Sequence, residues 1–212
     1  MFVKFWFVWY DISIKGGDFM NLPNKLTVLR IIMIPLVMVF YMVDAIPYGK
    51  LIAIALFVIA AFTDFLDGHI ARKNNLVTDL GKFLDPIADK LLVASVLFMI
   101  AIDGTIPNPW GLIVVTLIIS RELIIDAFRL IASNKGIVLA ADIWGKAKTM
   151  VQCWTMPLCM LLAFFEQCTK VGGAGLLTFQ VICYVLVGLS TVLTIISGVN
   201  YFVKNKQVIS SK

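Results

Sequence analysis

The sequence gathers five aspartates between Thr63 and Lys90, in the stretch TDFLDGHIARKNNLVTDLGKFLDPIADK. They are Asp64, Asp67, Asp79, Asp85 and Asp89. The first two are spaced i, i+3 and the last two i, i+4, so each of these pairs shares one face of a helix. Four converging carboxylates repel one another unless cations lie between them. Oxygen ligands of this kind select Mg²⁺, Mn²⁺ or Ca²⁺, and two such ions can stabilise both sides of a phosphoryl displacement.

The rest of the chain is strongly apolar. Of its 212 residues, 60% are hydrophobic and 15% are charged, and the mean hydropathy is +0.95. A soluble domain has about 45–50% apolar and about 25% charged residues, so this composition indicates an integral membrane protein. The net charge of +5 does not indicate a nucleic-acid partner, because the charges lie between apolar segments and form no continuous basic face.

Six apolar segments predict the elements that position the aspartates. They are residues 27–45, 50–70, 83–102, 109–132, 144–165 and 176–202. Each reaches the roughly 20 residues that a membrane-spanning helix needs, and Pro or Gly marks the breaks at 44–50, 103–110 and 166–175. The predicted fold is therefore all-α: a polytopic integral membrane protein with six transmembrane helices.

The basic residues predict the orientation in the membrane. With alternating spans, one side carries all but Lys50 and Lys170 of the 18 Lys and Arg. Basic residues favour the cytoplasmic side. We therefore expect an inner-membrane protein whose two termini and aspartate cluster face the cytoplasm.

The positions of the aspartates along their helices place them at the same depth in the membrane. Asp64 and Asp67 follow the second apolar run, and Asp85 and Asp89 precede the third. Measured from the outer ends of these antiparallel segments, both pairs lie about 20–25 Å along the helix. That distance is just within the inner edge of a hydrocarbon layer about 30 Å thick. One alternative is that Asp85-Pro86 is an ordinary helix start. Another is that the aspartates lie in a solvated loop and form ion pairs with nearby Arg and Lys residues.

The four cysteines show no metal-binding spacing. They are Cys153, Cys159, Cys168 and Cys183. We interpret them as small buried hydrophobic residues, because free Cys is often buried and inert.

The motif DxxDGxxARx(8)GxxxDxxxD, which runs from Asp64 to Asp89, resembles the signature of the CDP-alcohol phosphatidyltransferase family at every fixed position. His69 and Asp79 occupy variable positions and inherit no role. The segments that begin at Met20, Gly81, Arg121 and Trp144 are similar to the phosphatidylglycerophosphate synthase branch of that family. Together they cover most of residues 20–155.

The resemblance implies a reaction and a fold. Members transfer a phosphatidyl group from CDP-diacylglycerol to a hydroxyl acceptor and release CMP, and in this branch the acceptor is sn-glycerol 3-phosphate. The family fold has six transmembrane helices, usually in a homodimer, with a cytoplasm-facing polar cavity. The expected partners are therefore the two substrates, membrane lipids and a second copy of the chain.

The resemblance also implies roles for the motif residues. Two divalent cations, Mg²⁺ or Mn²⁺, would be held by the four carboxylates Asp64, Asp67, Asp85 and Asp89. Asp89 is the candidate catalytic base. The expected CDP-binding residues are Asp67, Gly68, Ala71, Arg72 and Gly81, since small residues let the nucleotide approach the backbone.

The acceptor phosphate needs cationic partners. The candidates are Arg121, Arg129, Lys146 and Lys148. Arg121 lies about 16 Å along its helix from the outer end, where an unpaired charge is costly. We therefore expect it to face the bundle interior, with a neighbouring acid as a candidate partner. For Lys146 and Lys148 the alternative is that they anchor the fifth helix at the anionic leaflet.

The first 19 residues differ from the rest. Their apolar run of about ten residues is too short to span, but its aromatic residues have helical spacing that suits an interfacial segment. The alternative is an upstream start or extension before Met20. The expected organisation is thus a possible interfacial segment at 1–19 and a six-helix domain at 20–212.

Two other functions remain open. A divalent-cation transporter also uses carboxylates within a membrane, but a pore needs polar positions along its whole length, and residues 51–62 and 91–102 are nearly unbroken apolar runs. Within the family, the acceptor could instead be inositol phosphate, serine or choline, because the aspartate motif serves the donor and the metals.

Overall fold

A computed structural model describes residues 22–73, 79–135, 137, 143–168 and 174–205, with side chains omitted at 22, 23, 64–73, 79, 80, 82 and 134. These residues form six α-helices. The helices are α2 (Leu22–Met42), α3 (Gly49–Lys73), α4 (Asp79–Ile102), α5 (Trp110–Asn134), α6 (Ile143–Cys168) and α7 (Ala174–Lys204). The segment 1–19, for which an interfacial position was expected, lies outside the described residues.

Each helix overlaps one predicted apolar segment, which confirms the all-α prediction. The start of α4 differs from the alternative in which Asp85-Pro86 begins a helix, because α4 begins at Asp79 and contains Pro86. Asp85-Pro86 is therefore not the helix start: the apolar run begins late, but the polar residues before it continue the same helix.

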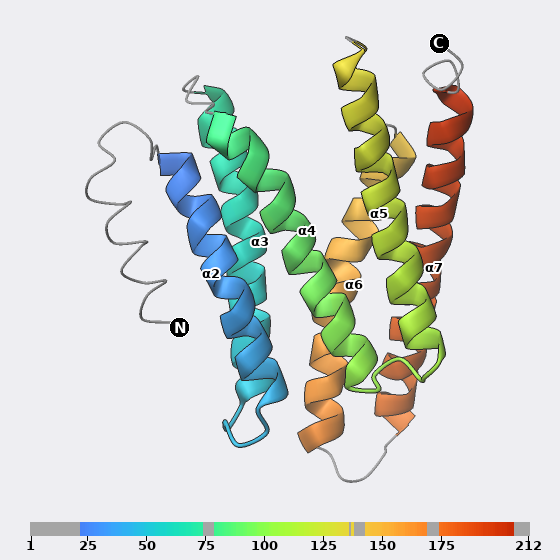
Figure 1. The fold of residues 1–212 in the computed structure, drawn as a ribbon. Helices are drawn as coiled ribbons and strands as arrows, with labels where there is room; N and C mark the ends of the chain where they lie inside the picture. The colour runs from blue at the N-terminus through green and yellow to red at the C-terminus, as the bar shows by residue number, and fades with distance from the viewer. Residues whose placement is uncertain (1–21, 74–78, 136, 138–142, 169–173, 206–212) are drawn as a thin grey trace.

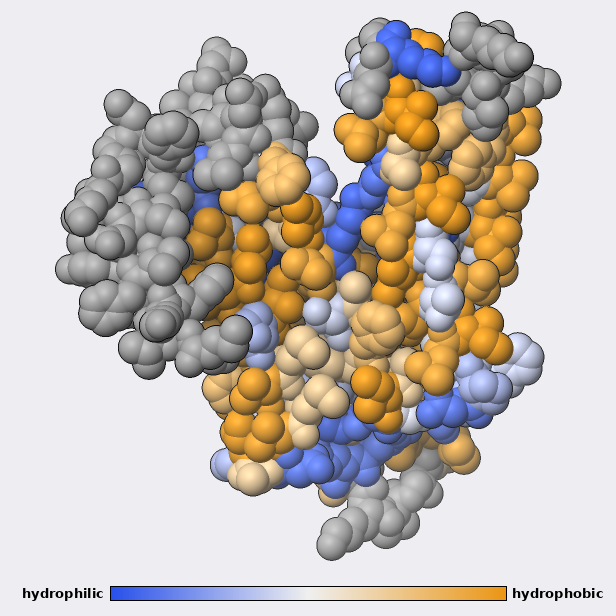
Figure 2. All heavy atoms as spheres, in the orientation of Figure 1, coloured by the Kyte–Doolittle hydropathy of each residue, from blue (hydrophilic) through white to orange (hydrophobic). Residues whose placement is uncertain are grey.

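Within the described part of the chain, three helices are long and apolar enough to cross a membrane. They are α2 from Asn24, α6 and α7. The other three helices contain more charged residues. In α3 these lie mainly in the second half, and in α4 they lie in the first half, where the aspartates are. Large apolar side chains are also exposed on all six helices, and Figure 2 shows them across the outer surface between the two ends. Soluble proteins rarely expose such an area, so these features indicate a membrane protein.

The helices run alternately up and down (Figure 1). The ends of α3 and α5 and the starts of α4 and α6 lie at the upper end, together with the start of α2 and the end of α7. α2 packs along α3 and α4, while α6 packs along α7. α4 contacts α5, and α3 contacts α6, so these contacts join the two groups of three helices.

The main apolar core joins all six helices. It includes Val37, Phe57, Val96, Ile118 and Met160. A second, smaller cluster of Ile125, Phe128, Ala132 and Tyr201 lies between α5 and α7 toward the upper end. The upper part of the molecule is thus divided between α2–α3–α4 and α5–α6–α7, and Figure 2 shows a notch between them that hydrophilic residues border.

The cysteine prediction holds for two residues. Cys159 and Cys183 are buried, but Cys153 and Cys168 are exposed. The interpretation of all four as buried is wrong for this pair, because each lies on an outward face of α6 or at its end.

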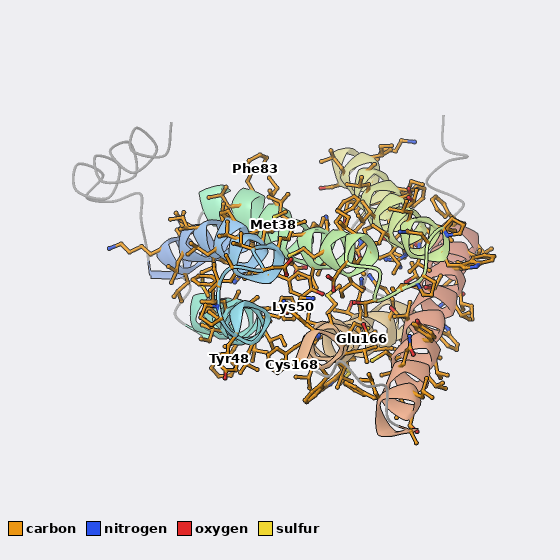
Figure 3. The ribbon with its side chains drawn as sticks, turned by 90° about the horizontal axis from the view of Figure 1, so that it is seen from below. Met38, Tyr48, Lys50, Phe83, Glu166 and Cys168 are labelled. Atoms are coloured by element: carbon orange, nitrogen blue, oxygen red, sulfur yellow. The ribbon has the colours of Figure 1, made fainter. Side chains whose placement is uncertain are left out.

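Opposite the notch, a polar cluster closes the lower end of the bundle. Lys50 points between α3 and α6 (Figure 3), and its Nζ lies 3.1 Å from both carboxylate oxygens of Asp103. Tyr41 Oη donates to Asp103 at 3.1 Å, Thr105 Oγ1 donates at 3.2 Å, and Lys50 also donates to the carbonyl of Ala163 at 3.4 Å. We call Lys50, Asp103, Tyr41 and Thr105 the lower cluster.

Candidate active site

Two of the predicted carboxylates lie in the first half of α4. Asp85 is half-buried and Asp89 is exposed, one helical turn further along. Thr27 of α2, which has no exposed surface, donates a hydrogen bond of 2.6 Å from Oγ1 to Asp85 Oδ1. Gly81, one turn before Asp85, is buried. Asp85 is thus fixed against α2, while Asp89 is accessible.

The other half of the motif lies at the upper end of α3. Asp64, Asp67, Gly68, Ala71 and Arg72 all fall within this helix, but their side chains are outside what the structure describes. Because α3 ends and α4 begins at the same end of the bundle (Figure 1), the backbone is consistent with two carboxylate pairs at one end. Convergence of the four carboxylates stays a prediction.

α5 presents two carboxylates to its neighbours. Glu122 forms an ion pair with Lys148 of α6, and Asp126, one turn further along, forms an ion pair with Lys90 of α4. Lys148 is only 3% exposed. These two pairs link α4, α5 and α6 near the boundary between the two groups of helices, so α5 organises the charged groups there.

The two arginines of α5 face α7. Arg121 Nη2 donates to Ser197 Oγ at 2.5 Å, and a Cβ on Gly198 would lie 3.3 Å from Arg121 Cγ. Arg129 Nε donates to Tyr201 Oη at 3.2 Å, and its guanidinium lies 5.4 Å from the centre of that ring. Arg121 therefore turns toward a neighbouring helix as expected, and among the described side chains its hydrogen-bond partner is a hydroxyl group rather than the acid considered from the sequence.

The four predicted acceptor-binding residues do not share one environment. Arg121, Arg129 and Lys148 contact other helices, whereas Lys146 is exposed. Burial and the pair with Glu122 do not fit the alternative that Lys148 is a leaflet anchor. The exposure of Lys146 is compatible with an anchoring role.

Lys90 connects the acidic and basic groups. It lies within electrostatic range of Asp89, Glu122, Arg129 and Lys148. Lys90 and Glu122 also border a cavity of about 170 Å³ between α4 and α5, whose other walls are apolar. Those walls are Leu91, Val93, Ala94, Ile118, Ile119 and Leu123. Charged groups therefore lie beside an apolar pocket, an arrangement suited to an amphiphilic ligand.

The carboxylates fit a hard divalent cation by their chemistry. Asp85 Oδ1 accepts the hydrogen bond from Thr27, which leaves Oδ2 as a possible ligand, and Asp89 is accessible. Among the described side chains, no group of three or more metal-binding residues occurs. The expected site of four ligands includes Asp64 and Asp67, which fall outside that set.

Sequence reasoning gave no role to Thr27, Lys90, Ser197 or Tyr201. Thr27 lies in the segment from Met20 that carries part of the family resemblance. That resemblance was the one sequence feature that could have pointed to a functional role for Thr27. Lys90 was considered only as an ordinary ion-pair partner. The hydroxyls of α7 lie in an apolar run that showed little specificity, so their contacts required the helix packing.

The comparisons with known proteins agree with this architecture. A family model described as CDP-alcohol phosphatidyltransferase matches residues 20–196. A curated CDP-diacylglycerol–glycerol-3-phosphate 3-phosphatidyltransferase of Bacillus subtilis (strain 168) is 36% identical over 202 residues, covering 90% of this chain and 98% of the relative.

Two further relatives extend this similarity. A protein of the same name from Rickettsia bellii (strain RML369-C) is 34% identical, covering 86% of this chain and 93% of the relative. A probable phosphatidylglycerophosphate synthase of Mycobacterium tuberculosis (strain CDC 1551 / Oshkosh) is 35% identical, covering 85% of this chain and 79% of the relative. Because the family model covers most of the sequence and these relatives match nearly end to end, the chain belongs to the CDP-alcohol phosphatidyltransferase family.

Proposed function

We propose that this protein transfers the phosphatidyl group of CDP-diacylglycerol to sn-glycerol 3-phosphate, giving phosphatidylglycerophosphate and CMP. The names of the curated relatives support both substrates. The structural observation that carries the proposal is the gathering of Asp85, Asp89 and the charged groups of α5 and α6 at one end of the bundle, above an apolar core.

The donor lipid accounts for that position. Its diphosphate must lie at headgroup level while its acyl chains stay in the bilayer, so a site near one end of the spanning helices meets both needs. We place six spans in the inner membrane, with both termini and a polar cavity on the cytoplasmic side, because the basic residues are concentrated at that end. Thiol labelling of single cysteines introduced at Lys204 and Asn108 would overturn this topology if both reacted from the same side.

The reaction assigns each group a role. The acceptor hydroxyl oxygen attacks the phosphorus of the phosphatidyl group, the new P–O bond forms, and the P–O bond to CMP breaks. Asp89, which is exposed, takes the hydroxyl proton as general base. Two Mg²⁺ or Mn²⁺ ions held by Asp64, Asp67, Asp85 and Asp89 would neutralise charge on the phosphoryl group and on the departing CMP.

The remaining predicted residues bind substrates. Gly68, Ala71, Arg72 and Gly81, with Asp67, would accommodate the cytidine diphosphate. Arg121, Arg129 and Lys148 would hold the acceptor phosphate through charge-assisted hydrogen bonds, and Lys146 would lie at the outer edge of that site.

We also propose that the protein forms a homodimer. Light scattering of the detergent-purified protein would contradict this by giving a monomer mass.

The direct test is CMP release by purified protein in detergent with CDP-diacylglycerol and Mg²⁺ or Mn²⁺. The acceptors to compare are glycerol 3-phosphate, inositol 1-phosphate and serine. We expect rapid metal-dependent release only with glycerol 3-phosphate. Release with another acceptor would keep the mechanism and overturn the acceptor assignment, whereas no release from folded protein would favour ion transport.

The apolar core argues against transport. Below the charged groups, α3, α4, α5 and α6 meet in the buried residues of the main core. An ion crossing there would lose its hydration and meet uncharged groups: the polar residues that line a small cavity in this core are Gln152, Thr155 and Ser190. The arrangement therefore favours a pocket open at one end over a path through the bundle.

A further inference from the structure

α2 carries a buried polar stripe on the face that it turns to its neighbours. Asn24, Thr27 and Arg30 are spaced i, i+3 and i+6, so they lie on one side of the helix. Each is at most 1% exposed. Because α2 packs along both α3 and α4, this stripe belongs to the helix that contacts both carriers of the aspartate motif.

Thr27 differs from two other buried threonines in its hydrogen bond. Thr155 and Thr194 each donate to a carbonyl oxygen one turn earlier in their own helix, both at 2.7 Å, which is a common use of a helical hydroxyl. Thr27 donates across the α2–α4 interface to the carboxylate of Asp85 at 2.6 Å. Its hydroxyl thus acts on a group of the candidate active site.

We propose that Thr27 is a positioning residue for the divalent-cation site. This inference rests on the proposed function, in which Asp85 is a metal ligand. A donor fixed on Oδ1 holds the carboxylate in one orientation and leaves Oδ2 available for the cation. Hydrogen-bonding partners of metal ligands orient the ligands in this way, and their loss typically costs about 10–100-fold in metal affinity.

The surroundings make Thr27 suited to this task. Because the hydroxyl is buried, water cannot take its place without a rearrangement, so its orientation is set by the packing around it. The bond also ties the position of Asp85 to the α2–α4 packing. A merely structural role would instead make Thr27 important for the stability of that packing and unimportant for the cation.

The test measures cation binding without turnover. Mn²⁺ is titrated into detergent-purified protein, free of substrates, and the free ion is followed by electron paramagnetic resonance. Thr27→Val keeps the side-chain shape and removes the hydroxyl, whereas Thr27→Ser keeps the hydroxyl. We expect Mn²⁺ affinity to fall about 10–100-fold in Thr27→Val and to stay near the unaltered value in Thr27→Ser.

The matched control is Thr194→Val, which removes an equally buried hydroxyl that bonds within its own helix. It should leave Mn²⁺ affinity unchanged. If Thr27→Val does not fold, Thr27→Ala makes the same chemical change in a smaller side chain. As a second readout, the Mn²⁺ concentration that half-saturates CMP release should rise in the hydroxyl-free variant more than the maximal rate falls.

Two results would overturn the inference. Equal Mn²⁺ affinity in Thr27→Val and the unaltered protein, together with metal-dependent CMP release by the latter, would leave the proposed function intact and reduce Thr27 to a packing residue. Absence of both Mn²⁺ binding and CMP release in folded, unaltered protein would remove the proposed function and this inference with it.

Discussion

The two ends of the bundle each bury a lysine beside a carboxylate, yet the two clusters differ in how their groups are used. In the lower cluster, Asp103 accepts hydrogen bonds from Lys50, Tyr41 and Thr105, and Lys50 also reaches a backbone carbonyl. At the upper end, Lys148 pairs with Glu122, but the neighbouring Asp89 and Arg129 are exposed. In the lower cluster the exposed Asp103 is held by three side-chain donors, whereas at the upper end the exposed Asp89 and Arg129 lie near a cavity.

This difference separates a structural cluster from a candidate active site. A buried charge must be paired and hydrogen-bonded, and in the lower cluster four side chains satisfy one another. At the upper end, charged side chains also border a cavity of about 170 Å³. Charge inside a membrane protein therefore does not identify a site by itself; accessible groups beside open space do.

The largest effect on activity should come from Asp89. Asp89→Asn keeps the size of the side chain and removes the proposed base, so we expect CMP release to fall by about 10²–10⁴-fold. Asp103→Asn is the matched change in the lower cluster and should leave the rate of CMP release nearly unaltered. Equal losses in the two variants would show that the comparison between the ends is wrong.

A smaller loss is expected for Lys148→Met. In the proposed function, Lys148 gives the acceptor phosphate one charge-assisted hydrogen bond, worth about 1.5–3 kcal/mol, so the KM for glycerol 3-phosphate should rise by about 10–100-fold in this variant. Steady-state kinetics at saturating CDP-diacylglycerol measure this. Lys146→Met, two residues away and exposed, is the control, and we expect a change of less than about threefold.

Tyr201→Phe should have a modest effect. It removes the hydroxyl that accepts from Arg129 and keeps the ring beside the guanidinium. One hydrogen bond is worth about 0.5–1.5 kcal/mol, so the KM for the acceptor should rise by less than about tenfold. An unchanged KM would show that the Arg129–Tyr201 contact does not orient Arg129 for binding.

The lower cluster should affect stability without affecting catalysis. Lys50→Met removes the cation from Asp103, which keeps the hydrogen bonds from Tyr41 and Thr105, so the free energy of unfolding should fall by about 1.5–3 kcal/mol. The double variant Lys50→Met, Asp103→Asn removes both charges and should recover part of that loss. Thermal unfolding in detergent measures the stability, and a large change in CMP release with stability preserved would contradict the assignment of this cluster to structure.

Much of the architecture could be predicted because its signals are local. A membrane-spanning helix is marked by a continuous apolar run and by its breaks, so all six helices were located, although the start of α4 at Asp79 lay before the apolar run. The aspartate motif likewise depends on spacing within two adjacent helices. It identified the family, which the match over residues 20–196 confirms.

The sequence by itself thus determined the helices, their order and which residues could take part in catalysis or binding. Only the tertiary structure decided which side chains meet. Thr27 bonds Asp85, Glu122 pairs with Lys148, and Arg121 contacts Ser197 rather than an acid. Such pairs join residues far apart in the chain, and they depend on which helix faces pack together. Periodicity identifies the face of one helix, but the packing of all six determines what that face contacts.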